Sequence, residues 1–318
     1  MRLLLAGGAG FIGSVLVPLL RSRGHDVTVA DLLWFGRHLP PDVPLIEQQL
    51  FELGAADLEE YDQVIFLAGL SNDPMAEFSP AQNFVENGAL PSYLAYVAKS
   101  AGVKRFIYAS SCSVYGFTDA TLANEESQVH CDYPYGISKL QGERGVLQMS
   151  DDHFSTIALR QGTVVGYSPR MRFDLIVNTM FKTALETGKI TINNPSIWRP
   201  ILDVRDTAEA FALAIEAPPE ISGVYNVAYD NYTVGEIGSQ VAQAVGELTS
   251  RDIELDVRDV EDFRSYRVST ERARDALGFN PRFDIRAIVE SLLEHRSEYG
   301  DFSKEAFYNI QIFKQLER

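Results

Sequence analysis

Gly7-Gly8-Ala9-Gly10-Phe11-Ile12-Gly13 follows an apolar run at residues 2–6 and opens a stretch of helical periodicity that ends near Arg23. A strand, a glycine-rich turn and a helix in this order form the phosphate-binding unit of dinucleotide-binding α/β proteins. Gly7 permits the tight turn, Gly10 lets the backbone approach a pyrophosphate, and Gly13 lets the helix pack closely on the strand. The helix N-terminus then offers N–H groups to the phosphates. The stretch predicts a dinucleotide cofactor held by Gly7, Gly10, Phe11, Ile12 and Gly13.

An acidic residue follows the second expected strand, residues 26–30. Asp31 stands at the end of that strand, where a carboxylate accepts hydrogen bonds from the adenosine ribose hydroxyls and repels a 2′-phosphate. This favours NAD as the cofactor. Arg37, the nearest cation in the following loop, leaves NADP as the alternative.

Short apolar runs alternate with longer amphipathic stretches over the first two-thirds of the chain, which is typical of βαβ units around a parallel sheet. We therefore predict an α/β fold with a Rossmann-type, doubly wound parallel sheet. The expected strands lie at residues 2–6, 26–30, 45–49, 63–68, 105–110 and 156–160, and the most evident helices at 84–101 and 135–148.

The pattern changes after Gly166. The next segment is irregular and proline-rich, whereas residues 201–204 and 223–228 look like strands that return to the main sheet. We predict an NAD-binding Rossmann domain at 1–166 with these return strands near 201–228. A smaller, interleaved α/β substrate-binding domain is expected at 167–200 and 229–318.

The composition argues against several classes of function. The 318 residues carry 28 basic and 44 acidic side chains, a formal charge of −16, and such a surface repels nucleic-acid phosphates. Cys112 and Cys131 are the only cysteines, and the five histidines are scattered without the spacing of metal ligands. The first residues reach glycine at once and match neither a signal peptide nor a spanning helix. We expect a cytoplasmic protein with no metal, nucleic-acid partner or membrane partner.

Tyr135 and Lys139 lie at positions i and i+4 of an expected helix and project from one face of it. Residues 104–116 read as a buried strand that ends in a hydroxyl-rich turn containing Ser111. Parallel strands present their carboxyl ends to the ligand crevice, so Ser111 and Tyr135 should meet there. A free tyrosine has a pKa of about 10. A nearby ammonium and an oxidised nicotinamide favour the phenolate and lower this pKa, so the pair predicts a catalytic acid/base.

These motifs together resemble the extended short-chain dehydrogenase/reductases, in particular the NAD-dependent nucleotide-sugar epimerase/dehydratase family. The resemblance covers nearly the whole chain. It is carried by the GGAGFIG turn, Asp31, VIFLAGLSND at 64–73, Asn87, KRFIYASSCSVYG at 104–116, PYGISK at 134–139, WRPILDVRD at 198–206 and Arg264 before LGF at 277–279.

The resemblance implies a role for each of these positions. Tyr135 would be the acid/base on a sugar hydroxyl, Lys139 would hold the nicotinamide ribose, and Ser111 would bind the same sugar oxygen and relay its proton. Further NAD contacts would come from Gln49, Leu50, Leu67, Ala68, Gly69 and Asn87. Contacts with a nucleotide-diphosphate sugar would come from Ser71, Asn72, Ser113, Thr163, Arg199 and Arg264, the two arginines clasping the diphosphate. Family members commonly pair the helices at 84–101 and 135–148 in a four-helix bundle, which implies a homodimer.

Two further segments refine the resemblance. Dehydratases of the family carry an Asp-Glu pair directly after the position of Ser111, where this chain has Cys112 and Ser113. Neither side chain replaces those carboxylates, so a 4,6-dehydratase is not expected. The segment SPRMRFDLIVN at 168–178 is similar to a smaller subgroup that includes GDP-heptose C4 dehydrogenases of bacterial surface-polysaccharide pathways. That similarity implies substrate contacts from Arg170, Arg172 and Asn178.

The predicted activity is NAD-dependent oxidation at C4 of a nucleotide-diphosphate sugar. The keto sugar is either re-reduced after it turns over, as in an epimerase, or released, as in a C4 dehydrogenase. An NADH-dependent reductase of 4-keto nucleotide sugars and a non-catalytic NAD-binding protein are the alternatives.

Overall fold

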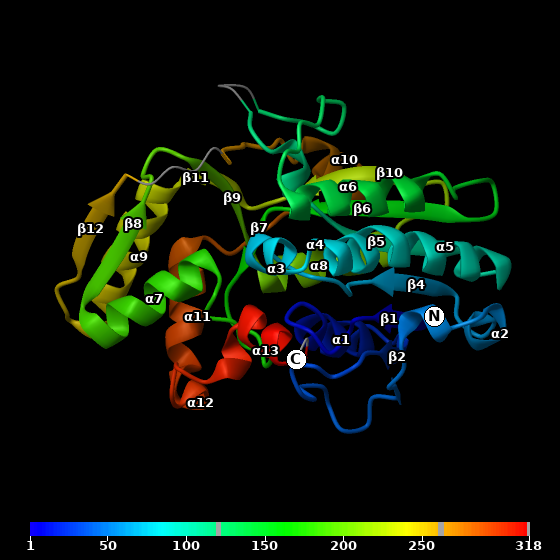
Figure 1. Cartoon of the computed structure of the whole chain (residues 1–318), viewed down its shortest axis with the longest axis horizontal. Coiled ribbons are helices and arrows are strands. Elements are labelled where there is room, and N and C mark those ends of the chain that lie inside the picture. The colour runs from blue at the N-terminus through cyan, green and yellow to red at the C-terminus, as the bar shows by residue number, and fades with distance from the viewer. Residues whose placement is uncertain (119–121, 260–263, 317–318) are drawn as a thin grey trace.

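The central sheet sets the architecture. The computed structural model describes residues 1–118, 122–259 and 264–316. Seven strands pair in parallel in the order β10-β6-β5-β4-β1-β2-β3 (Figure 1), which confirms the predicted doubly wound α/β fold. The chain builds outward from β1 in both directions, which opens a ligand crevice at the carboxyl ends of the strands. The strands are β1 (Arg2–Ala6), β2 (Asp26–Ala30), β3 (Leu45–Ile46), β4 (Gln63–Phe66), β5 (Arg105–Ser111), β6 (Ser155–Gln161) and β10 (Gly223–Val227).

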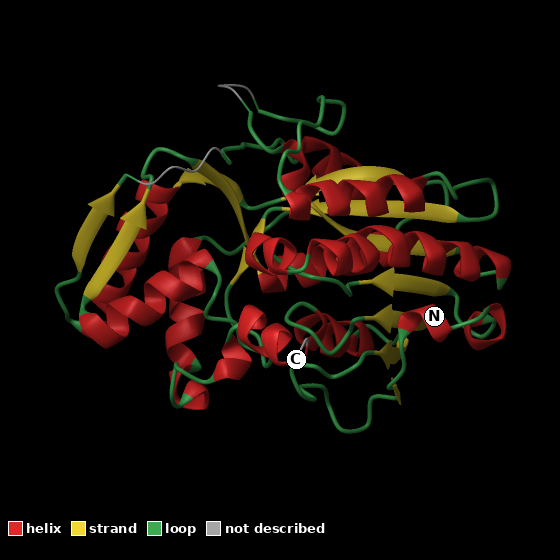
Figure 2. Ribbon diagram, in the orientation of Figure 1, coloured by secondary structure: helices red, strands yellow, loops and turns green. Residues whose placement is uncertain are grey.

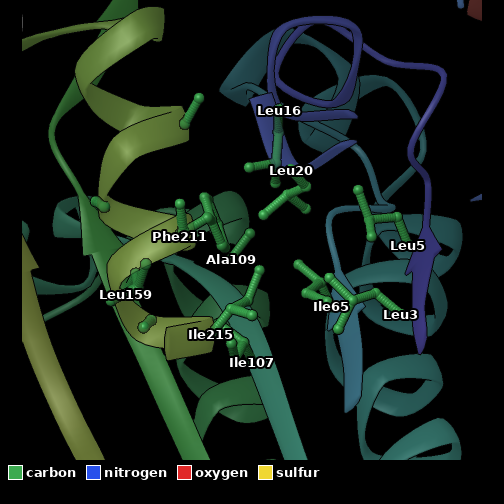
Figure 3. Close-up of a cluster of buried hydrophobic side chains, with 14 of the residues drawn as sticks. Leu3, Leu5, Leu16, Leu20, Ile65, Ile107, Ala109, Leu159, Phe211 and Ile215 are labelled. Carbon is green, nitrogen blue, oxygen red and sulfur yellow. The ribbon is translucent and has the colours of Figure 1, made fainter. Parts of the chain in front are cut away.

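Apolar side chains cover both faces of this sheet. Leu3 and Leu5 of β1 pack on one face with side chains of α1 and α8, among them Phe211 (Figure 3). Leu4 and Ala6 alternate with them and point to the other face, toward α5 and α6. Complete burial of each such leucine contributes roughly 1.5–3 kcal/mol. The helices of this part, other than those near the site, are α1 (Gly13–Ser22), α2 (Ala55–Leu58), α8 (Val204–Glu216) and α10 (Glu271–Leu277).

The helix expected at residues 84–101 is interrupted. α3 (Asp73–Phe78) and α4 (Pro80–Phe84) lead into a π-helical turn at Val85–Ala89, which α5 (Leu90–Ser100) continues. α6 (Pro134–Leu147) packs on this turn at Gly142, where a Cβ would lie 2.2 Å from the carbonyl oxygen of Asn87. A glycine therefore sets how deeply α6 sits in the fold.

A second body follows residue 166 and has its own core. Phe181 of α7, Ile237 of α9 and Ile288 of α11 are fully buried in it. Figure 2 shows these helices beside the short strands β8 and β12, apart from the main sheet. None of the described helices of either part is long and apolar enough to cross a membrane. The elements are β7 (Thr163–Val165), α7 (Ile176–Thr187), β8 (Lys189–Asn193), β9 (Trp198–Asp203), β11 (Asp230–Thr233), α9 (Val234–Thr249), β12 (Glu254–Arg258), α11 (Ile285–Glu294), α12 (Arg296–Tyr299) and α13 (Asn309–Leu316).

The two strands expected to return to the main sheet behave differently. β10 does return and pairs with β6, whereas β9 does not, so the prediction for residues 201–204 is wrong. The reason is that β5 and β10 already occupy both edges of β6. β9 pairs instead with β11 and with β7, which continues the chain of β6 beyond Gly162.

The C-terminal helix α13 comes from the second body and lies against the first (Figure 1). Its Phe313 is completely buried beside Leu70 and Met75, and the ring lies 6.1 Å from that of Trp34. The helix therefore joins the loops that follow β2 and β4, both of which reach the crevice.

Candidate active site

A cavity of about 410 Å³ lies between the carboxyl ends of the sheet strands and the second body. Its wall contains all of the predicted site residues except Asn87 and Asn178. These wall residues are Gly7, Gly10, Phe11, Ile12, Gly13, Asp31, Gln49, Leu50, Leu67, Ala68, Gly69, Ser71, Asn72, Ser111, Ser113, Tyr135, Lys139, Thr163, Arg170, Arg172, Arg199 and Arg264.

The glycine turn leaves its backbone open to this cavity. A Cβ on Gly7, whose φ is +79°, would lie 2.4 Å from Ala68 N, and a Cβ on Gly13 would lie 2.1 Å from the carbonyl oxygen of Gly8. A Cβ on Gly10 would meet only the carbonyl oxygen of Gly7, at 3.4 Å, so the space there is kept for something other than protein. α1 begins at Gly13 without a cap from any described side chain, which leaves its N-terminus available to a phosphate. The cradle fits a dinucleotide.

Asp31 lies beside the turn at the end of β2. Its two carboxylate oxygens accept hydrogen bonds from the backbone N–H groups of Ala9, at 2.9 Å, and Leu33, at 2.8 Å. Burial nevertheless raises the pKa of Asp31 above its usual value. Arg37 donates to the carbonyl groups of Pro41 and Val43 and is not part of the described cavity wall, so it does not serve as the cation that would accept a 2′-phosphate.

Tyr135 and Ser111 come together as the order of the strands requires. Ser111 is the last residue of β5, and Tyr135 is in the first turn of α6, directly after Pro134. Both side chains line the same cavity, and the Ser111 hydroxyl is near enough to lower the pKa of Tyr135. In the protein alone, burial raises the pKa of Tyr135, and the nearby Ser111 hydroxyl offsets this rise only in part. The expected lowering of this pKa is therefore absent before ligands bind.

Lys139 lies one turn further along α6 and is 6% exposed. Its Nζ is 4.7 Å from the centroid of the Tyr108 ring, whose π face attracts the ammonium. Burial lowers the pKa of Lys139 to about 7, although Glu143 raises it. Burial thus disfavours the charged form of Lys139 as it does that of Tyr135.

A buried ion pair fixes the helix that carries both residues. The Glu143 carboxylate of α6 accepts hydrogen bonds from Arg160 of β6, at 2.6 and 2.9 Å, and from the Ser110 hydroxyl, at 2.6 Å. Removing one partner of such a pair costs about 3–5 kcal/mol. α6 is thereby held to the strands that end at the cavity.

A chain of hydroxyl groups continues from the tyrosine–serine pair. The Ser111 hydroxyl donates to Ser113 Oγ at 3.1 Å, and Ser113 Oγ is hydrogen-bonded to Tyr266 Oη at 3.2 Å. Cys112 is buried and its Sγ donates to the carbonyl of Arg160, away from the cavity. The positions that follow Ser111 therefore present a hydroxyl and no carboxylate to a bound sugar.

Arg199 and Arg264 also line the cavity. Nη1 of Arg264 pairs with the Asp73 carboxylate at 2.5 Å, and its guanidinium lies 5.3 Å from the Tyr133 ring. Nη1 of Arg199 donates to the carbonyl oxygen of Arg264, and its guanidinium lies 5.6 Å from the Tyr266 ring. The two cations therefore form one cluster, which also contains Asp73 and the rings of Tyr133 and Tyr266.

Asn87 and Asn178 support the site without lining the described cavity. The Asn87 amide donates to the carbonyl of Leu70 and to Asn83 Oδ1, both at 2.8 Å, which ties the loop after β4 to the π-helical turn. Asn178 binds both backbone groups of Gly166 and the carbonyl of Arg172, and it is completely buried. The expected substrate contact from Asn178 is replaced by a structural one, because its amide is already occupied.

Wall residues that were not predicted as site residues include Gln161, Tyr266, Asp73 and Asn309. Gln161, Tyr266 and Asn309 belong to no motif with a recognised spacing. Asp73 was the one with a usable signal, because it directly follows Ser71 and Asn72 at the end of a recognised run.

A glycine turn after β1, an acid after β2 and a cavity wall shared by Ser111 of β5 with Tyr135 and Lys139 of α6 are typical of dinucleotide-binding α/β enzymes. Residues 3–228 match the NAD dependent epimerase/dehydratase family. The chain belongs to this family and is an enzyme of it, and NAD is the family's cofactor.

Relatives of known name extend the match beyond residue 228. A UDP-glucose 4-epimerase of Mycolicibacterium smegmatis is 30% identical over 92% of this chain and 98% of its own. Another, of Corynebacterium glutamicum, is 26% identical over 96% of this chain and 99% of its own. The solved structure of MoeE5 in complex with UDP-glucose and NAD has a TM-score of 0.83 and 27% identity, and covers 95% of this chain and 100% of that one.

Proposed function

We propose that the enzyme uses NAD to oxidise C4 of a nucleotide-diphosphate sugar, as an epimerase or a C4 dehydrogenase. The observation that carries the proposal is the placement of Tyr135, Ser111 and Lys139 on the wall of the same cavity as the glycine turn. Similarity to UDP-glucose 4-epimerases and to a structure with bound UDP-glucose supports a UDP-hexose as the first substrate to test. The GDP-heptose subgroup and its polysaccharide pathways stay predictions.

We assign each residue on the cavity wall a separate role in such a reaction. Gly10, the N-terminus of α1 and Asp31 would hold NAD, which supplies the hydride acceptor when it is bound. Tyr135 Oη would take the proton of the C4 hydroxyl, directly or through Ser111 Oγ, and return it in the reverse direction. Lys139 would hold the nicotinamide ribose, and Arg199 and Arg264 would bind the sugar-nucleotide diphosphate.

Two features of the site bear on the direction of the chemistry. The absence of a carboxylate at Cys112 and Ser113 leaves no group there to eliminate water, which supports oxidation without dehydration. The Tyr266–Ser113–Ser111 hydroxyls add donors and acceptors on the sugar side of Tyr135. They would orient a sugar whose hydroxyls lie in either configuration.

The test is a panel of UDP-, GDP- and dTDP-hexoses with the purified enzyme, followed at the NADH absorbance and by separation of the sugar products. An epimer formed without free NADH supports the epimerase, and stoichiometric NADH with a keto sugar supports the dehydrogenase. Consumption of NADH only when a 4-keto sugar is supplied would establish the reductase instead. No conversion of any sugar in either direction would contradict the proposal.

We also propose that the enzyme is a homodimer formed through α4, α5 and α6. These neighbouring helices carry large apolar side chains that remain exposed, among them Phe84 at 50%, Tyr96 at 59% and Ile137 at 39%. Figure 1 shows α5 and α6 side by side over one face of the sheet. A second copy of the same face would cover them.

Localisation in the cytoplasm stays a prediction.

A further inference from the structure

Arg170 is a buried cation whose hydrogen bonds are incomplete. It is 2% exposed, and its Nη2 donates to Asn309 Oδ1 at 2.5 Å. Its Nε and Nη1 have no acceptor among the residues that the structure describes. Leaving buried donors unsatisfied is unfavourable, so the fold maintains this arrangement at a cost. The neighbouring Arg172 differs, because Asp174 accepts from it at 2.9 and 3.1 Å.

The place of Arg170 associates it with the dinucleotide end of the cavity. Its guanidinium lies 3.7 Å from the centroid of the Phe35 ring, in the loop after β2, and it interacts electrostatically with Asp31. Ser168, two residues earlier, donates to the carbonyl oxygen of Phe11 in the glycine turn at 2.7 Å. The segment that was expected to reach the substrate therefore runs across the turn that would hold NAD.

The strand order separates this end from the catalytic end. β2 lies three positions from β5, which carries Ser111, and strands are spaced about 4.8 Å apart, so the two ends are roughly 14 Å from each other. Arg170, which contacts Phe35 and Asn309, thus lies nearer to β2 than to Ser111.

The C-terminal helix holds Arg170 in this position. Asn309, the first residue of α13, accepts from Arg170 and donates through Nδ2 to Ser71 Oγ at 2.7 Å and through its backbone N–H to Asp174 at 3.3 Å. Phe313 anchors the same helix between the loops after β2 and β4. Together they close the dinucleotide end of the cavity from outside.

We propose that Arg170 binds a phosphate of the dinucleotide, and that α13 holds it there as a clasp that retains NAD through successive turnovers. The two unsatisfied N–H groups suit phosphate oxygens, which guanidinium groups bind through parallel hydrogen bonds. Burial and the nearby Arg172 lower the pKa of Arg170 to about 9. A bound anion would stabilise the charged guanidinium and raise this pKa again. The inference rests on the proposed function for the identity of the dinucleotide.

The first experiment compares NAD binding in Arg170→Met, Arg170→Lys and the wild type by calorimetry of protein stripped of nucleotide. Loss of the charge-assisted hydrogen bonds should weaken NAD binding roughly tenfold to a hundredfold in Arg170→Met, with partial recovery in Arg170→Lys. Arg205→Met is the matched control, because Arg205 also stacks on a ring, that of Phe283 at 3.6 Å, but lies outside the described cavity wall. It should bind NAD like the wild type.

Fragments of NAD locate the contact. Arg170→Met should weaken ADP as much as NAD and leave adenosine unchanged. Equal weakening of adenosine, or loss of NADP binding with NAD binding intact, would overturn the phosphate assignment. If the wild type binds no dinucleotide, the proposed function itself fails, whereas equal binding of NAD to the wild type and Arg170→Met contradicts only this inference.

A second variant tests the clasp. Asn309→Ala keeps the Arg170 guanidinium but removes its hydrogen bond to α13. NAD should then dissociate faster, and less NAD should remain with the protein after gel filtration. The dissociation rate can be followed through the fluorescence of Trp34, which lines the same cavity. A dissociation rate equal to that of the wild type would show that α13 does not retain the dinucleotide.

Discussion

Tyr135 and Lys139 share an environment that disfavours charge on both of them. Burial raises the pKa of the phenol and lowers that of the ammonium, so the protein alone holds the pair close to neutral. A phenolate beside an ammonium becomes favourable only when positive charge or polar ligand groups enter the cavity. Ligands that bring positive charge or polar groups beside Tyr135 should therefore favour its ionisation.

Tyr135→Phe isolates the acid/base step. The change removes one oxygen and keeps the ring, so turnover should fall about a hundredfold to ten-thousandfold while NAD binding remains. Steady-state rates with an active sugar and the NAD content of the purified protein measure the two effects. Tyr167→Phe, whose hydroxyl bonds Glu298 outside the described cavity wall, is the control and should keep wild-type rates. Unchanged turnover in Tyr135→Phe would remove this tyrosine from the mechanism.

Lys139→Met tests the cost of burying the ammonium. The pKa of Lys139 is about 7 in the folded protein and 10.5 for an ordinary lysine. Between about pH 7 and pH 10.5 the lysine is therefore protonated in the unfolded chain and largely neutral in the folded one. Stability of the wild type therefore rises with pH across this window, and the cost is fully present below about pH 7. The variant should melt at a higher temperature than the wild type when ligand-free, with a larger difference at about pH 6 than at about pH 9.

Thermal unfolding of stripped protein at the two pH values gives this difference directly. Lys104→Met, at an exposed lysine, is the matched control and should show no pH-dependent gain. A difference for Lys139→Met that is the same at both pH values would mean that Lys139 is not buried as a charge.

At the scale of elements, the short helix α3 places a carboxylate beside Arg264, one of the two arginines proposed to bind the substrate diphosphate. Asp73, its first residue, pairs with Arg264 and also raises the pKa of Tyr135 through its charge. A diphosphate that binds Arg264 would compete with this carboxylate for the guanidinium. We therefore expect a change at Asp73 to affect both substrate binding and the pKa of Tyr135.

Asp73→Asn should lower KM for the nucleotide sugar roughly twofold to fivefold, because the competing ion pair is partly exposed and of modest strength. The pH at which kcat/KM rises should also move downward, since a negative charge near Tyr135 is removed. Asp42→Asn breaks the exposed pair with Arg21 away from the described cavity wall and should change neither quantity. A raised KM in Asp73→Asn would show that Asp73 orients Arg264 for the substrate.

Local patterns predicted some elements to the residue and misplaced others. β1 and β2 agree with the expected ranges because apolar runs bounded by glycine or charge leave little choice of strand ends. The partner of β9 depended on which edge of β6 was free, and that is decided by β10, which follows it in sequence. The interruption at Val85–Ala89 was not visible either, because a π-helical turn has no pattern of its own.

The same distinction applies to the site. The glycine turn, Asp31 and the Tyr135–Lys139 pair were predictable because each acts through a fixed spacing within one element. Arg170 was placed with the substrate because its segment was read by resemblance alone. Its substrate contact stays a prediction, whereas the contacts of Arg170 with Phe35 and with α13, on which we base the proposed phosphate contact, are encoded by no spacing in the sequence.

At the scale of the molecule, the two faces of the main sheet are covered unequally. α1 and α8 bury one face within the chain, as Figure 3 shows. On the other, α4, α5 and α6 cover the sheet but leave apolar side chains of their own exposed. Apolar patches of this kind on a folded protein mark interaction sites. Self-association through these helices would complete the burial.

The dimer predicts a specific loss of assembly. Phe84→Glu combined with Tyr96→Glu places like charges from both copies against one another, so the variant should sediment as a monomer where the wild type sediments as a dimer. Phe117→Glu, at a residue 56% exposed outside these helices, is the matched control and should remain dimeric. The catalytic residues lie on the cavity side of α6, so the monomer should still bind NAD. A wild type that stays monomeric at roughly 100 μM would exclude this interface, because that concentration exceeds the Kd of most specific dimers.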